Sequence, residues 1–104
     1  MKLVSVEEFD KLRANKANIV LDVRTPEEFK AGHIPGATNI NYTASDFGEK
    51  VAKLDKDKTY LVHCAAGVRS ARACKKMEGL GFKNLVDLHA GFGGWEEAGK
   101  PVEK

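Results

Sequence analysis

Short apolar segments alternate with helix-like segments along this chain, and this alternation constrains the fold more than any other feature. Residues 18–23 (NIVLDV), 60–62 (YLV) and 84–88 (NLVDL) have the pattern of strands that are buried on both faces. Segments with apolar residues at helical spacing separate them. Strands that alternate with helices form βαβ units, so we expect an α/β fold. Its central, mostly parallel sheet of about five short strands should carry helices on both faces.

Capping signals mark where two of the expected helices begin. Ser5 and Glu8 have the spacing of a capping box. Thr25 and Glu28 repeat that spacing, and Pro26 fits the first helical position between them. We therefore expect helices to begin directly after Ser5 and Thr25.

Glycine, proline and serine residues suggest the other boundaries. Pro35 and Gly36 break the chain ahead of a short strand that ends at Ile40. Ser70 is expected to cap a helix that carries an apolar face. The glycine-rich segment 91–94 (GFGG) is expected to form a turn that leads into a last helical piece.

Composition predicts an ordinary globular protein of one domain, residues 1–104. The chain is 42% hydrophobic and 31% charged, and its net charge of +2 comes without a block of one sign, so nucleic-acid binding is not indicated. No stretch approaches the ~18 apolar residues of a membrane span. Acidic residues at positions 7 and 8 interrupt any signal-peptide apolar region. We expect a cytoplasmic protein with two free cysteines that binds no membrane.

The segment from Tyr60 to Ser70 (YLVHCAAGVRS) carries the main chemical signal. Cys64 ends an apolar run, small residues follow it, and Arg69 comes next to the expected helix cap. Reactive loops of parallel sheets lie at the carboxyl ends of strands, and the free N–H groups at the start of a helix stabilise an anion. A cysteine at such a site, near an arginine, is stabilised as its thiolate, which is the nucleophilic form.

Core packing is the ordinary role of a lone cysteine at the end of a buried strand. The small side chains of Ala65, Ala66 and Gly67 argue against that role, because they leave the backbone free to curl round the sulfur. Together with Arg69, they favour a nucleophilic Cys64 whose sulfur the loop exposes for chemistry.

Two chemistries fit a thiolate surrounded by N–H groups. Residues 63–70 nearly match the protein tyrosine phosphatase signature, which has one more residue between its cysteine and its arginine. Here four residues intervene, namely Ala65, Ala66, Gly67 and Val68. One residue spans up to ~3.5 Å of chain, about the difference between room for a sulfur atom and room for a tetrahedral oxyanion.

Three motifs, which follow one another in the order typical of the family, resemble the rhodaneses, sulfurtransferases that carry sulfur as a cysteine persulfide. Residues 64–70 (CAAGVRS) are similar to the family's active-site loop. Residues 21–40 (LDVRTPEEFKAGHIPGATNI) are similar to its amino-terminal signature, and residues 91–95 (GFGGW) to its carboxy-terminal one. The resemblance covers the whole chain and implies a rhodanese-like fold.

The resemblance also implies a two-step mechanism without a cofactor. Cys64 takes the outer sulfur of a donor, which is thiosulfate, polysulfide or a persulfide, and a thiol, cyanide or protein acceptor then removes it. Ala65 stands where many thiosulfate-using members carry Arg, Lys or Gln, so the donor stays open. Cys64 is the expected catalytic residue, and the expected substrate-binding residues are Ala65, Ala66, Gly67, Val68, Arg69, Ser70 and Arg24.

Other polar residues have structural interpretations. Asp22 and Arg24 are expected to pair beside the loop, with Arg24 nearer to the site. The side chain of His63 leaves its strand on the face opposite Cys64, which favours a packed histidine over a general base. Cys74 lies on the apolar face of its helix, where packing is favoured over a resolving thiol.

Two alternatives to an enzyme of this family stay open. A catalytically idle rhodanese-type module would serve in binding or regulation, and a small phosphatase would need the longer loop. The chain retains Cys64, Arg69 and the short loop, which favours the sulfurtransferase. His33 and His89 lack the spacing of metal ligands, so no metal site is expected.

Overall fold

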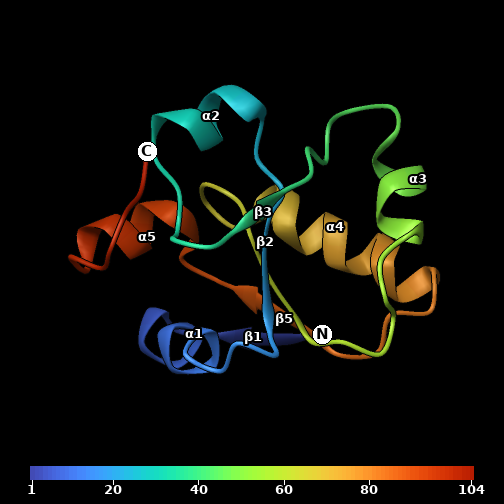
Figure 1. The fold of residues 1–104 in the computed structure, drawn as a ribbon, viewed down its shortest axis with the longest axis horizontal. Helices are drawn as coiled ribbons and strands as arrows, with labels where there is room; N and C mark the ends of the chain where they lie inside the picture. Colours follow the sequence, from blue (N-terminus) through green and yellow to red (C-terminus); the bar gives the residue numbers. More distant parts are fainter.

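A parallel five-stranded sheet forms the centre of the protein in the computed structural model, which describes residues 1–104 (Figure 1). The strands are β1 (Lys2–Val4), β2 (Ile19–Asp22), β3 (Thr38–Asn39), β4 (Tyr60–His63) and β5 (Leu85–Leu88). Their order in the sheet is β1-β5-β4-β2-β3, and every neighbouring pair is parallel. The expected α/β fold is therefore confirmed.

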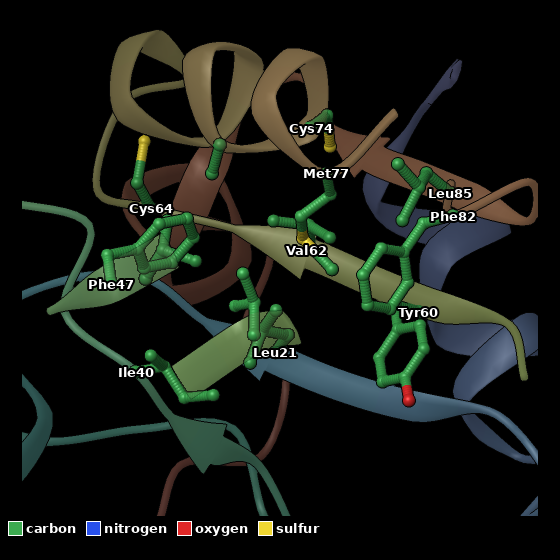
Figure 2. Close-up of a cluster of buried hydrophobic side chains, with 13 residues drawn as sticks. Leu21, Ile40, Phe47, Tyr60, Val62, Cys64, Cys74, Met77, Phe82 and Leu85 are labelled. Carbon is green, nitrogen blue, oxygen red and sulfur yellow. The ribbon is translucent and has the colours of Figure 1, made fainter. Parts of the chain in front are cut away.

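Five helices follow the strands, and four of them cover the two faces of the sheet. They are α1 (Val6–Arg13), α2 (Pro26–Ala31), α3 (Phe47–Ala52), α4 (Val68–Gly79) and α5 (Gly91–Glu97). α3 and α4 pack on one face through a cluster of 13 buried residues (Figure 2). α1 and α5 pack on the other face through a second cluster of 9. None of these helices has the length and apolar character needed to cross a membrane.

Strand order determines where the chemistry can lie. β4 is the middle strand, with β2 on one side and β5 on the other. His63 at the end of β4 pairs with Asp22 at the end of β2, so the two strands end level with each other. The loop after β4 therefore leaves the sheet at the centre of its carboxyl edge, as the argument from parallel sheets predicts.

The amino-terminal region differs from its expected form. β1 was not expected, because it is a three-residue edge strand whose first two residues are exposed, which leaves no apolar pattern to detect. Ser5 accepts a hydrogen bond from the Glu8 N–H, as a cap does. The Glu8 carboxylate instead pairs with Lys2 Nζ at 2.8 Å, so only half of the expected capping box forms. At Thr25 and Glu28 the complete box is confirmed.

The expected beginnings of two helices, α4 and α5, were also wrong. Gly67, not Ser70, is the N-cap of α4, and its left-handed backbone (φ +98°) turns the chain so that the helix begins at Val68. Ser70 consequently lies inside the first turn. The segment 91–94 is not a turn ahead of α5 but the beginning of that helix.

Candidate active site

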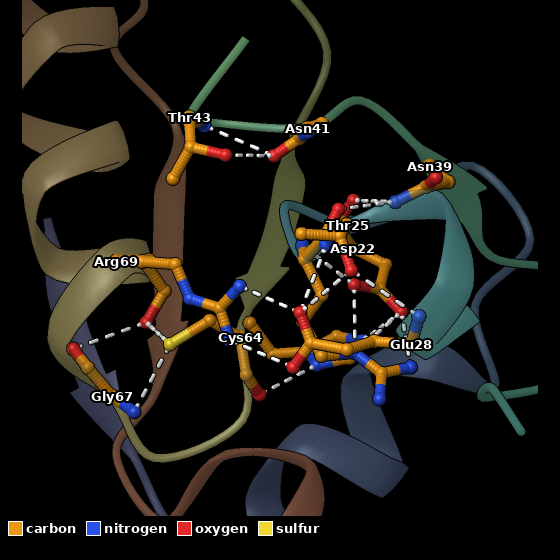
Figure 3. Close-up of polar contacts among 12 residues, drawn as sticks. Asp22, Thr25, Glu28, Asn39, Asn41, Thr43, Cys64, Gly67 and Arg69 are labelled. Carbon is orange, nitrogen blue, oxygen red and sulfur yellow. Dashed lines mark hydrogen bonds and ion pairs between the residues drawn. The ribbon is translucent and has the colours of Figure 1, made fainter. Parts of the chain in front are cut away.

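Cys64 lies at the carboxyl edge of the sheet, beneath the first turn of α4 (Figure 2). Its sulfur is 3.1 Å from the Gly67 backbone nitrogen, which donates to it, and 3.5 Å from the Ser70 hydroxyl oxygen (Figure 3). The residue is only 1% exposed. The expectation of an exposed sulfur is therefore wrong: the loop closes over it because Cys64 also belongs to the apolar cluster under α4.

Hydrogen bonds lower the pKa of Cys64 in spite of its burial. Burial favours the neutral thiol, but the Ser70 hydroxyl and the backbone N–H groups of Ser70, Ala66 and Gly67 favour the thiolate and outweigh it. Of these N–H groups, that of Gly67 makes a hydrogen bond to the sulfur in this structure. The hydroxyl of Ser70, which was expected only as a helix cap, accepts from the Cys64 thiol and donates to the Gly67 carbonyl, and once Cys64 is ionised it can donate to the thiolate.

Arg69 binds Glu28 and makes no hydrogen bond to the Cys64 sulfur. Its Nη1 and Nη2 donate to the two carboxylate oxygens of Glu28 at 2.7 and 2.9 Å (Figure 3). This pair lowers the pKa of Glu28 to about 2 and raises that of Arg69. The charge of Cys64 also raises the pKa of Arg69, but after the effects of Glu28. Arg69 therefore anchors the loop more than it stabilises the thiolate.

Glu28 connects the loop to the start of α2, a contact that sequence reasoning missed. Its Oε1 accepts hydrogen bonds from the Thr25 N–H and hydroxyl, both at 3.0 Å. The same carboxylate thus caps α2 and binds Arg69, which is 41 residues away in the sequence. The capping box was visible in the sequence, but no local signal indicated the second partner.

The glycine-rich start of α5 supports the loop from the other side. The N–H groups of Phe92 and Gly93 donate to the carbonyls of Cys64 and Ala65 at 2.8 and 3.1 Å. Gly91 has φ +66°, and a Cβ there would overlap the Ala65 backbone. These contacts hold the carbonyls on the side of α5, so the loop N–H groups remain free to face the sulfur. Sequence reasoning assigned this segment no such role.

Gly67 has a similar steric requirement on the opposite side of the loop. A Cβ at this position would come within 2.8 Å of the His89 carbonyl oxygen, in addition to the strain of φ +98°. The next residue, Val68, is 61% exposed, so the loop presents an apolar side chain to solvent. Only glycine fits where the chain bends to direct its N–H group at Cys64.

Asp22 and Arg24 form the expected pair, below the loop. Arg24 donates to both carboxylate oxygens of Asp22 at 2.7 to 3.1 Å and to the Gly32 carbonyl at 2.8 Å. Its guanidinium carbon lies 4.2 Å from the centre of the Phe92 ring. These contacts bury Arg24, and none of its hydrogen bonds reaches residues 64–70. Its role in substrate binding stays a prediction.

His63 and Cys74 are packed residues, as expected. His63 is fully buried on the face opposite Cys64, with Nδ1 3.2 Å from the Cys64 carbonyl and Nε2 3.6 Å from Asp22. Burial lowers the pKa of His63, against the opposing charge of Asp22. Cys74 is fully buried on the face of α4 that packs in the apolar cluster, and burial raises its pKa to about 12.

Comparison with known proteins identifies the family. The sequence model of the Rhodanese-like domain family matches residues 5–98. This chain belongs to the rhodanese-like domain family. A solved structure of a rhodanese-related protein from Thermoplasma volcanium superposes with a TM-score of 0.88 at 38% identity, and the match covers 99% of this chain and 98% of that one.

Curated relatives of this rhodanese-like protein are mostly named for sulfur transfer. The putative sulfurtransferase YtwF of Bacillus subtilis is 39% identical over 92 residues, which are 88% of this chain and 86% of YtwF. The thiosulfate sulfurtransferase GlpE of Pseudomonas entomophila is 38% identical over 95 residues, 90% of this chain and 84% of GlpE. A relative named dual specificity phosphatase Cdc25, from Arabidopsis thaliana, is 36% identical and matches 80% of this chain and 64% of its own length.

Proposed function

We propose that this protein is a sulfurtransferase in which Cys64 carries sulfane sulfur as a persulfide. Family membership and the names of YtwF and GlpE support sulfur transfer in general. The observation that carries the mechanism is the set of N–H groups and the hydroxyl around Cys64, which lower its pKa and so favour the nucleophilic thiolate.

The proposed reaction has two steps. In the first, the Cys64 thiolate attacks the outer sulfur of the donor, a new S–S bond forms, and the donor's S–S bond breaks. The donor leaves with the electron pair, as sulfite from thiosulfate or as a thiolate from a persulfide. In the second step a thiol or cyanide attacks the outer sulfur, and the electron pair returns to Cys64 as its thiolate. No separate general base is needed, because the thiolate is already formed.

The loop is suited to hold one additional sulfur atom. We assign this role to the backbone N–H groups of Ala65, Ala66, Gly67, Val68, Arg69 and Ser70. Four residues between Cys64 and Arg69 give a short loop, which favours a single terminal sulfur over a phosphoryl group. Residues 1–104 would form one domain. In the cytoplasm, where thiols are kept reduced, such thiols would serve as sulfur acceptors.

The charge balance of the loop bears on the donor. Arg69 is the only cationic residue between positions 64 and 70, and Glu28 offsets its charge. A dianion such as thiosulfate would find little net positive charge, so we favour polysulfide or a persulfide as the donor. The name of GlpE supports thiosulfate instead, and the experiment below includes both.

Intact-mass spectrometry tests the proposal directly. We expect the native chain to gain one sulfur atom from polysulfide, more than from thiosulfate at equal concentration, and to lose it when cyanide is added. Cys64→Ser should gain none, whereas the matched variant Cys74→Ala should gain one as the native chain does. If no donor adds sulfur to a folded native chain, the non-catalytic binding module becomes the better interpretation.

A phosphatase is the second candidate, because a relative carries that name. The short loop argues against it, since a phosphoryl group brings three further oxygens that need donors and space. We expect no hydrolysis of p-nitrophenyl phosphate above the level of Cys64→Ser. Hydrolysis that depends on Cys64 would contradict the proposed function.

A further inference from the structure

Asp87 is a buried carboxyl group that the proposed mechanism does not use. It lies on β5 and is 1% exposed. Leu85, two residues earlier on the same strand, packs in the cluster under α4, so Asp87 faces the same helix. Neither of its carboxylate oxygens has a hydrogen-bond partner. Because burying an unpaired carboxylate is unfavourable, its presence calls for an explanation.

Ser70 is the group that relates Asp87 to Cys64. Its side chain is fully buried in the first turn of α4, and its hydroxyl oxygen lies 3.5 Å from the Cys64 sulfur and 3.3 Å from the Gly67 carbonyl oxygen. Asp87 pairs across the sheet with Val62, two residues before Cys64 on β4, so its side chain lies at the same end of the sheet as Cys64. Burial raises the pKa of Asp87 and the nearby Ser70 hydroxyl lowers it, although no hydrogen bond joins the two side chains in this structure. One hydroxyl therefore acts on two titratable groups.

The other groups that face Asp87 leave it without an ionic partner. α4 contributes Cys74, whose pKa Asp87 raises through its charge, after the effect of burial. His89, just past the end of β5, lowers the pKa of Asp87 through its charge. β1 places Leu3 opposite, β4 places Val62 opposite, and no salt bridge includes Asp87. Burial dominates this balance and raises the pKa of Asp87.

We propose that Asp87 is a positioning residue that directs the Ser70 hydroxyl and thereby sets the stability of the Cys64 thiolate. The proposal rests on the proposed function only in treating that thiolate as the reacting form. A hydroxyl has one proton to donate. In this structure Ser70 donates it to the Gly67 carbonyl oxygen at 3.3 Å, and on rotation it can donate instead to the Cys64 sulfur or to Asp87, but to only one acceptor at a time.

The two protonation states of Asp87 have opposite effects. When protonated, the carboxyl O–H donates to the Ser70 oxygen, and the Ser70 proton is free to donate to the thiolate. When ionised, the carboxylate accepts the Ser70 proton, so the thiolate loses a donor and gains a negative charge nearby. Ionisation of Asp87 thus raises the pKa of Cys64, and the two groups titrate as a coupled pair.

The pH dependence of Cys64 alkylation by iodoacetamide, followed by peptide mass spectrometry, tests this coupling. We expect the native chain to give a curve broader than that of a single proton. Asp87→Asn keeps the shape of the side chain and donates an N–H to Ser70, so its curve should narrow to one proton. Its midpoint should fall by about one pH unit, the size expected when a charged acceptor retains a hydrogen bond.

Ser70→Ala tests the route through the hydroxyl and does not require the Asp87 variant to fold. Its midpoint should rise by about one pH unit above the native one. In the Ser70→Ala background, the Asp87→Asn change should move the midpoint less than half as far as in the native chain. His89→Asn is the matched control for the other ionisable side chain near Asp87, and the broad curve should persist in it.

Specific results would overturn the proposal. The first is an alkylation curve of Asp87→Asn that coincides with the native one. The second is an Asp87→Asn change that moves the midpoint as far in the Ser70→Ala background as in the native chain. The third is a Ser70→Ala curve that coincides with the native one. A native breadth that disappears in His89→Asn would assign the coupling to that histidine instead. Alkylation needs no sulfur donor, so a chain that shows the coupling but forms no persulfide would refute the proposed function and leave this inference intact.

Discussion

Cys64 and Cys74 belong to the same apolar cluster and are almost equally buried, at 1% and 0% exposure, yet their pKa values move in opposite directions. Burial raises the pKa of both thiols, and at Cys74 the charges of Asp87 and Glu78 add to it and bring the value to about 12. At Cys64 one hydroxyl and three N–H groups reverse the effect. Burial therefore does not by itself decide the direction in which the pKa of a cysteine moves in this protein, because the donors directed at the sulfur can outweigh it.

The donors in turn depend on contacts that hold the loop. On one side, Glu28 binds Arg69 (Figure 3). On the other side, the first turn of α5 binds the Cys64 and Ala65 carbonyls. Cys74 has no such surroundings because it lies in the middle of α4, where the backbone N–H groups are used within the helix. The position at a strand end is what separates the two thiols.

The largest expected effect on sulfur-transfer activity comes from replacing each of the two cysteines separately. Cys64→Ser should lower cyanide-dependent sulfur transfer to the uncatalysed level, because the hydroxyl cannot form a persulfide. Cys74→Ala should keep at least half of the native kcat/KM and lose on the order of 1 kcal/mol of stability, the usual cost of a small core truncation. Steady-state kinetics measures the activity of each variant, and urea unfolding measures its stability. An inactive, folded Cys74→Ala would mean that Cys74 takes part in the chemistry.

A pair of glycine substitutions should separate loop support from backbone strain. Gly91 and Gly36 both have positive φ, at +66° and +81°, but a Cβ at Gly91 would overlap the Ala65 backbone, whereas at Gly36 nothing lies within 4 Å. Gly91→Ala should lower kcat/KM at least tenfold, equivalent to ~1.4 kcal/mol of transition-state stabilisation. Gly36→Ala should cost only about 1 kcal/mol of stability. Equal activities of the two variants would show that α5 does not shape the loop.

The alkylation midpoint of Cys64 gives a smaller but more direct measure of the comparison. We expect it below the ~8.5 of a free thiol. In the folded chain, Cys74 should stay unmodified throughout the neutral range, since burial raises its pKa to about 12. In urea, both thiols should react with the midpoint of a free cysteine. A folded-state midpoint for Cys64 at or above the urea value would contradict the preformed thiolate.

The features that could be predicted from the sequence are local ones. The apolar runs of β2, β4 and β5 and the capping box of Thr25 and Glu28 depend on neighbouring residues, so their patterns are visible. The same patterns predicted the position of Cys64 directly after the central strand β4.

The features that could not be predicted are contacts between distant segments. The binding of Arg69 by Glu28, the support of Ala65 by the start of α5 and the approach of Asp87 to Ser70 all join residues that only the folded sheet brings together. The sequence argument assigned the thiolate's stability partly to Arg69 because the two residues are close along the chain. In three dimensions the guanidinium is hydrogen-bonded to the carboxylate of Glu28 and not to the sulfur.

The smallest expected effect on activity and stability comes from removing the ion pair between Arg69 and Glu28. Glu28→Gln removes the charge that Arg69 binds and keeps an oxygen for the Thr25 N–H. The pair is about one third exposed, so its contribution to stability should stay under ~1 kcal/mol. Glu27, which precedes Glu28 and is exposed, supplies the matched control Glu27→Gln. We expect Glu28→Gln to reduce kcat only a few-fold, because the N–H groups and Ser70 still surround Cys64.

The pH dependence of this small effect has a defined sign. Folding lowers the pKa of Glu28 from 4.5 to about 2, so its carboxylate stabilises the native state fully above pH 4.5. That contribution is lost as the pH falls towards 2, because the carboxyl group then takes up a proton in both states. The stability difference between the native chain and Glu28→Gln, measured by urea unfolding, should therefore shrink over this range, while the difference for Glu27→Gln stays small throughout. A difference for Glu28→Gln that does not change with pH would mean that the carboxylate's charge does not hold Arg69, and that the loop keeps its shape through α5 alone.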